Sequence, residues 1–183
     1  MGKLMEKIIN YKLENFLKQD RTLIEDYVAI LSNSLPIPTK RQLWFMKLKH
    51  VEFIKQNINS TNDDSIIQIL KLTEGIKKNE VKEMTITKFF GKINSVKEQL
   101  ETINRAEQQL ESDHINPKWE AVEGSKRMAK FGILNILDNL SDGDILKWKK
   151  VKNLQFSDVF AKLLMDKTKN DIQIEMNNVK INN

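Results

Sequence analysis

One apolar seam constrains the fold of this chain more than any other feature of its sequence. Large apolar residues recur there at alternating steps of four and three, with one skip at Glu107: Phe89, Ile93, Val96, Leu100, Ile103 and Leu110. This spacing predicts one long helix from about Thr87 to Ser112, with all six side chains on one face. Polar residues such as Lys92 and Arg105 fall on its other faces. We therefore expect another helix to cover the seam, either from this chain or from a partner protein.

Composition limits the class of protein. The chain has 183 residues, of which 40% are apolar and 30% charged, and this fits one domain or two small ones that can bury a core. The absence of cysteine excludes disulfides, thiolate zinc sites, iron–sulfur clusters and cysteine nucleophiles. No apolar run approaches the roughly 20 residues that span a bilayer, and the N-terminal segment lacks the apolar block of a signal peptide. We expect a protein that is made and kept in a cytoplasm.

Apolar periodicity divides the chain into a series of helices. The predicted helices span about 22–32, 39–58, 64–76, 87–112 and 118–140, then a short segment ending at 151 and a last helix over 157–176, after a loosely helical segment at about 4–18. The stretch NEVKEMTIT alternates like a strand but has no partner strand, so we expect a connector. The sequence thus predicts an all-α fold, a bundle of about six to seven helices with one long amphipathic central helix.

Capping residues and inward faces define these helices further. The boundaries rest on Thr39 with Gln42, Gly75, Asn116 with Pro117, Ser141 with Asp144, and Ser157. The residues expected to face inward are Leu23, Tyr27, Ile30 and Leu31 in one helix and Leu43, Met46, Val51, Ile54 and Ile58 in the next. Gly124 and Gly132 mark points where the 118–140 helix can kink. We expect an N-terminal helical region over 1–113 and a C-terminal helical module over 114–183, with a frayed tail.

No motif for catalysis, cofactor binding or metal binding stands out. The segment DNLSDGD at 138–144 superficially resembles a calcium loop, but Leu140 and Lys149 stand where an EF-hand needs oxygen ligands. The two histidines, His50 and His114, are far apart and lack metal-ligand spacing. We therefore expect a protein without catalytic, cofactor or metal residues.

Two basic stretches interleave lysines with aromatic residues. The first decorates the 39–58 helix around Trp44 and Phe45. The second consists of Lys147, Trp148, Lys149, Lys150 and Lys152. Lysines beside stacking aromatic rings are how single-stranded nucleic acid is commonly held, and they also fit an anionic protein surface. The bland interpretation, a solvated helix face, stays open because the net charge of +5 is only a mild excess.

The C-terminal half carries a family resemblance. Residues 131–176, FGILNILDNLSDGDILKWKKVKNLQFSDVFAKLLMDKTKNDIQIEM, resemble the short helical modules of tailed-bacteriophage tail-assembly and virion-associated proteins. Together with LPIPTKRQLWFMKLKHVEFIKQ at 35–56 and a composition typical of AT-rich genes, the chain looks most like a small structural protein of a crAss-like phage. The resemblance implies a non-enzymatic subunit of the connector, ring or tail region, present in several copies in the virion after synthesis in the bacterial host cytoplasm.

The expected function follows from these observations. We expect a structural or assembly component of a phage particle that binds copies of itself and other virion proteins through helix faces, with no membrane partner. The seam of residues 89–110 is the candidate partner surface, and the lysines around Trp148 are the candidate patch for an anionic partner. The alternative is a nucleic-acid-binding accessory or regulatory protein that uses the basic helices.

Overall fold

The computed structural model describes residues 11–111 and 116–179, and in these ranges the chain is all-helical. Helices are joined by turns, and the only extended pairings there are two isolated antiparallel bridges. This confirms the all-α class. No helix in the described ranges is both long and apolar enough to cross a membrane. The chain divides into two compact units, residues 1–46 with 53–102 and residues 47–52 with 103–183, whereas the sequence suggested a division at residue 113.

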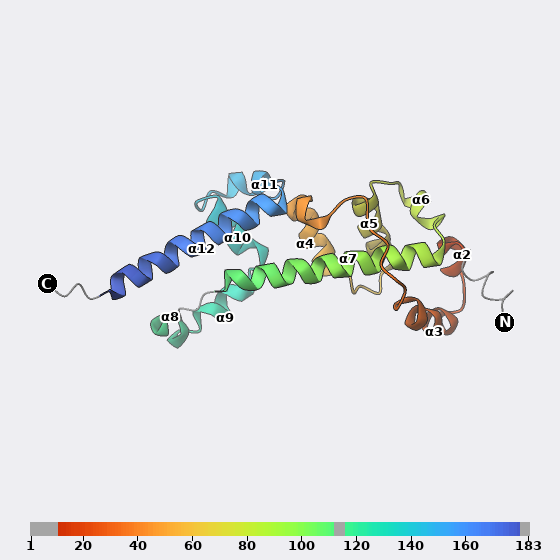
Figure 1. The fold of residues 1–183 in the computed structure, drawn as a ribbon, viewed down its shortest axis with the longest axis horizontal. Coiled ribbons are helices and arrows are strands. Elements are labelled where there is room, and N and C mark those ends of the chain that lie inside the picture. The colour runs from red at the N-terminus through yellow and green to blue at the C-terminus, as the bar shows by residue number, and fades with distance from the viewer. Residues whose placement is uncertain (1–10, 112–115, 180–183) are drawn as a thin grey trace. The chain divides into compact units, whose positions relative to one another are not determined.

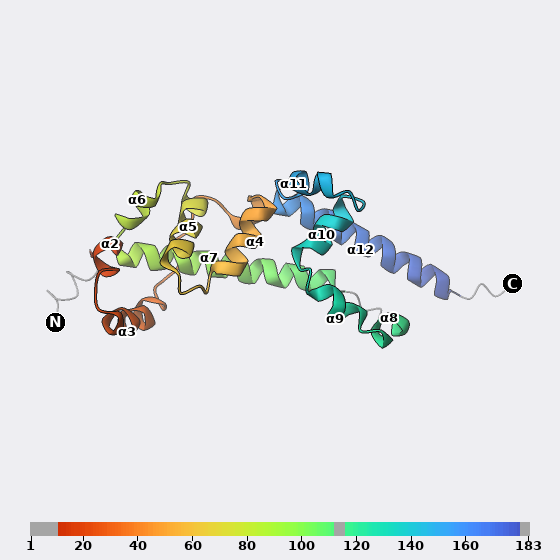
Figure 2. The same ribbon diagram turned by 180° about the vertical axis from the view of Figure 1, so that it is seen from behind.

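The first unit is built on most of one long helix. Its elements are α2 (Leu13–Phe16), α3 (Arg21–Leu31), the 3-10 turn η1 (Leu43–Phe45), part of α4 (Leu48–Asn57), α5 (Asp63–Glu74), α6 (Lys78–Lys82) and most of α7 (Ile86–Glu107). In both views α3 lies on a different side of α7 from α5 and α6 (Figures 1 and 2). The predicted long helix is present, although its last turn, η2 (Gln108–Leu110), tightens to 3-10 geometry.

Helix α5 ends at the predicted Gly75 and begins one residue before the predicted start, after a cap at Asn62 that the sequence analysis did not name. The Asn62 side chain accepts a hydrogen bond from the Asp64 backbone N–H at 2.9 Å, which satisfies a free donor of the first turn. Gly75 ends the helix in the left-handed conformation, at φ 69°, and its N–H is donated to the Lys71 carbonyl. Glycine is favoured here because residues other than glycine rarely adopt this left-handed conformation, and a Cβ atom would also require the Arg41 guanidinium to move.

The segment before α4 departs from the prediction, because no helix begins at Thr39. The Thr39 hydroxyl instead accepts a hydrogen bond from the Gln99 amide at 2.9 Å and donates one to the Arg41 carbonyl. The Gln99 side chain also accepts from the Leu43 N–H at 2.8 Å, and Arg41 N–H is donated to the Thr73 carbonyl. These bonds to α5 and α7 hold the segment extended until η1, and they replace the local capping box that the sequence offered.

The seam of α7 lies in the core. Phe89, Ile93, Val96, Leu100 and Ile103 are all buried, whereas Leu110 is half-buried. Lys92, which was expected on a polar face, is also buried, and this expectation is wrong. Its ammonium group pairs with the buried Glu74 carboxylate at 3.2 Å and donates to the Pro38 carbonyl. A buried charge needs such partners, so a helical wheel alone could not place Lys92.

The second unit contains the remaining helices. They are α8 (Pro117–Ala121), α9 (Gly124–Ala129), α10 (Ile133–Leu140), η3 (Ile145–Lys147), α11 (Trp148–Val151) and α12 (Phe156–Asn178). Asn116 caps α8 as predicted and accepts from two backbone N–H groups. The continuous helix expected over 118–140 is instead three short ones, since Glu123 and Gly132 take positive φ angles of 54° and 48°.

Two further capping predictions fail in this unit. Asp144 alone caps η3 by accepting from the Leu146 N–H, while the Ser141 hydroxyl turns back to the Asp138 carbonyl. Helix α12 begins at Phe156 rather than being capped by Ser157. Its start is fixed by an antiparallel bridge between Lys47 and Gln155, so a tertiary pairing takes the place of a side-chain cap.

Candidate functional site

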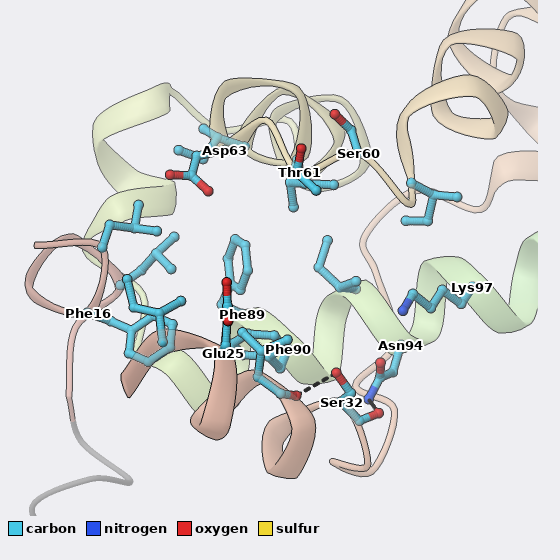
Figure 3. A pocket seen from close by; sticks show the side chains of 18 of the residues that line it. Phe16, Glu25, Ser32, Ser60, Thr61, Asp63, Phe89, Phe90, Asn94 and Lys97 are labelled. Atoms are coloured by element: carbon cyan, nitrogen blue, oxygen red, sulfur yellow. Dashed lines mark hydrogen bonds between the residues drawn. The ribbon is translucent and has the colours of Figure 1, made fainter. Parts of the chain in front are cut away.

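The first unit contains a cavity of about 570 Å³. Its apolar lining comes from α2, α3, α5, α7 and the end of α4: Leu13, Phe16, Leu17, Ile24, Val28, Ile58, Ile66, Ile67, Phe89, Phe90 and Ile93. Polar side chains stand among them, including Glu25, Asp63, Asn94 and Lys97 (Figure 3). A volume of this size, a mainly apolar wall and a few polar groups are typical of small-molecule binding sites.

Particular contacts hold the walls of the cavity. At one end the Phe16 ring packs edge-on against Tyr27 of α3 and Phe90 of α7, with ring centroids 6.5 and 6.2 Å apart. At the other end the Asn94 amide donates to the carbonyls of Ser32 and Ser34, at 3.1 and 2.7 Å. These contacts tie the second half of α3 and the segment after it to α2 and α7.

Helix α3 has a charged cap at its first turn. The Asp20 carboxylate accepts hydrogen bonds from the hydroxyl and the backbone N–H of Thr22, and these bonds lower the pKa of Asp20 below its ordinary value.

The inward face predicted for helix α3 is partly wrong. Leu23 and Ile30 are 48% and 68% exposed, because Ile24 and Val28 face the cavity instead.

The predicted partner seam takes part in the core of the chain itself. Five of its six residues are buried by other parts of this chain, so little of the seam is open to a partner in this conformation. Surface for an interaction must be sought elsewhere.

The predicted anionic-partner patch is only partly open. Lys147, Lys149 and Lys150 are exposed, whereas Lys152 is half-buried, and Lys147 pairs with Asp144 at 3.4 Å. Trp148 is half-buried, and its indole Nε1 is buried with no hydrogen-bond partner in the described part of the chain. The structure therefore groups the lysines on α11 but turns the polar edge of the expected stacking ring inward.

A surface that the sequence analysis missed lies along α12. Met165, Ile172 and Met176, which we call the α12 stripe, are 48%, 51% and 62% exposed, and the 65% exposed Val179 follows the helix directly. At 100° per residue the three side chains fall within an arc of about 40°. The core-facing residues Phe156 and Phe160 point to the opposite side. In the sequence the stripe is visible as apolar residues at steps of seven and four. The second apolar face of the same helix, which carries Phe156 and Phe160, obscured this pattern.

The remaining candidates form no site. His50 is half-buried in α4, and His114 lies outside the described residues. The calcium-like segment is a helix end, with the Gly143 N–H donated to the Asp138 carbonyl at 2.9 Å. In the described residues, no group of three or more His, Asp or Glu side chains is placed to hold a metal ion.

Comparison with protein-family models, with curated proteins and with solved structures finds no match to this chain.

Proposed function

We propose that the protein is a non-enzymatic structural or assembly component of a tailed-phage particle, made in the bacterial host cytoplasm and carried in the virion. The resemblance of residues 131–176 to phage assembly modules supports a place for this protein in a phage particle. The α12 stripe supports the mode of action, because its exposed apolar side chains share one helix face, with Lys169 between Met165 and Ile172, and can contact another protein.

The occupant that we propose for the stripe is α12 of a second copy. Met165 and Ile172 are seven residues apart, and Met176 follows four residues later, which is the spacing that lets two helices pack along one seam. The ion pairs Lys162–Asp166 and Lys167–Asp171 hold charged side chains away from the stripe. The stripe spans only about 16 Å of helix, so we expect weak association unless several copies assemble together.

The burial of the seam on α7 supports a division of labour. We propose that α7 is the central helix of a bundle in the first unit, while α12 presents the contact surface. Neighbouring virion proteins would then bind exposed helix faces and not the α7 seam.

The test of this proposal is the oligomeric state. Light scattering over about 1–200 μM should show mass increasing with concentration for the unaltered protein, and Ile172→Glu should remain monomeric because a buried carboxylate opposes association. Asn170→Glu is the matched control, since it adds the same charge about 160° away on the helix. A strictly monomeric protein at all concentrations would contradict self-association, as would equal association of the two variants.

The alternative, a nucleic-acid-binding accessory protein, has the exposed lysines of α11 in its favour. The burial of the Trp148 indole Nε1 speaks against this alternative, because the polar edge of the ring that would stack on a base is turned toward the protein. We expect only non-specific binding to single-stranded DNA, with a dissociation constant no tighter than about 10⁻⁶ M at physiological salt. Fluorescence titration at two salt concentrations measures this. Nanomolar binding that is lost when Lys147, Lys149, Lys150 and Lys152 become glutamine would favour the alternative.

A further inference from the structure

The cavity of the first unit is walled by α2, α3, α5 and α7 and is partly open to solvent, and its volume is small for a helix of a partner. Phe16 packs edge-on against Phe90 in its wall, and the Asn94 bonds to Ser32 and Ser34 join α7 to the segment that follows α3. A helix with its side chains is about 10–12 Å wide and needs an open groove. A cavity of about 570 Å³ instead suits a small, slender molecule.

Charges on the cavity wall differ between its two ends. Figure 3 shows Asp63 and Glu25 nearer the end marked by Phe16 and Phe89, while Lys97 lies beyond Asn94 at the other end. Lys97 is exposed, and its ammonium group forms no ion pair with the described residues. Phe89, Phe90 and Ile93 form an apolar floor along α7 that leads toward it.

We propose that this cavity binds an amphiphile with a single apolar chain or ring system and an anionic head group. The head group pairs with Lys97 Nζ, and the apolar body lies over Phe89, Phe90 and Ile93. The Asp63 carboxylate disfavours an anion near the other end, so the ligand has one orientation. This site is separate from the α12 stripe and does not depend on the proposed assembly function.

The probes are three ten-carbon compounds that differ in the head group: decanoate, 1-decanol and decyltrimethylammonium. Each is titrated calorimetrically into the full chain, below the concentration at which it forms micelles. We expect saturable binding of one decanoate per chain, and binding of decyltrimethylammonium that is about tenfold weaker. Lys97→Gln should weaken decanoate about tenfold and leave 1-decanol unchanged, because only the anion uses the ammonium group. Lys88→Gln, an exposed lysine of α7 outside the cavity, is the matched control.

A second pair of variants tests the location. Val28→Trp should fill the cavity and abolish binding of all three compounds, whereas Ala29→Trp places the same ring on the exposed side of α3 and should not. Circular dichroism checks that both variants keep their helix content. If Val28→Trp does not fold, the Lys97 and Lys88 pair still decides the question.

Four results would overturn the proposal: no saturable binding of decanoate, equal binding of the three compounds, decanoate binding to Lys97→Gln that matches Lys88→Gln, or binding to Val28→Trp that matches Ala29→Trp. The ligand proposal and the assembly proposal are tested separately. Light scattering should give the same oligomeric state for Lys97→Gln as for the unaltered protein, because Lys97 lies outside the α12 stripe.

Discussion

The two long helices, α7 and α12, have almost the same length and opposite surroundings. Helix α7 has 22 residues and its apolar seam is buried along most of the helix. Helix α12 has 23 residues, but its buried residues are confined to the first turns, at Phe156, Val159 and Phe160, and the later large apolar residues are half-buried or exposed. Both patterns are periodic in the sequence. Periodicity therefore identifies an apolar face, whereas the rest of the chain decides whether that face becomes core or contact surface.

The largest expected difference between the two helices concerns their ion pairs. Lys92→Met in α7 should reduce the free energy of unfolding by about 3–5 kcal/mol, because the buried Glu74 carboxylate loses its charged partner. Lys162→Met in α12 breaks the solvent-accessible pair with Asp166 and should change the free energy by about 0–1 kcal/mol. Urea unfolding followed by circular dichroism measures both. Similar losses would mean that the Lys92–Glu74 pair is not buried.

Apolar truncations give the next largest difference. Leu100→Ala should destabilise the protein by roughly 2–5 kcal/mol, since it leaves a cavity in the core. Ile172→Ala should stay within about 0.5 kcal/mol when measured at a concentration where the protein is monomeric. The same denaturation experiment checks both variants. A large loss for Ile172→Ala in the monomer would show that the stripe packs within its own chain.

The comparison of helices also explains how much of the fold the sequence could predict. Local signals predicted the long helix, the end of α5 at Gly75 and the Asn116 cap of α8, because each depends on residues close in the chain. The Thr39 capping box failed because Gln99, distant in sequence, offered competing hydrogen bonds. The burial of Lys92 depended in the same way on Glu74 and Pro38.

For the candidate sites, too, the sequence predicted what depends on nearby residues and missed what depends on tertiary contacts. The sequence identified the seam on α7 but not its burial, and it grouped the lysines around Trp148 but not the direction of the indole ring. It did not predict the cavity, because Phe16, Val28, Asp63 and Lys97 come from four separate segments. Only the tertiary arrangement brings them together.

A smaller effect is expected from the cap of α3. Because the folded-state pKa of Asp20 is lowered, its contribution to stability is present above the ordinary pKa of about 3.8 and is lost as the pH falls through the lowered value. Asp20→Ser keeps a capping oxygen but removes this titration. The difference in stability between the two proteins should therefore shrink below about pH 3.8. Urea unfolding at pH 5 and pH 3 measures it, and a difference that does not change with pH would contradict a stabilising charge at this cap.

Amide hydrogen exchange tests the contrast between α7 and α12 most directly. The backbone amides of residues 93–103 should be protected equally at low and high protein concentration, because their seam is buried within one chain. The amides of residues 170–178 should exchange rapidly in dilute protein and become protected as the concentration rises, and Ile172→Glu should abolish that gain. Protection of residues 170–178 that does not depend on concentration, or protection of α7 that does, would contradict the account.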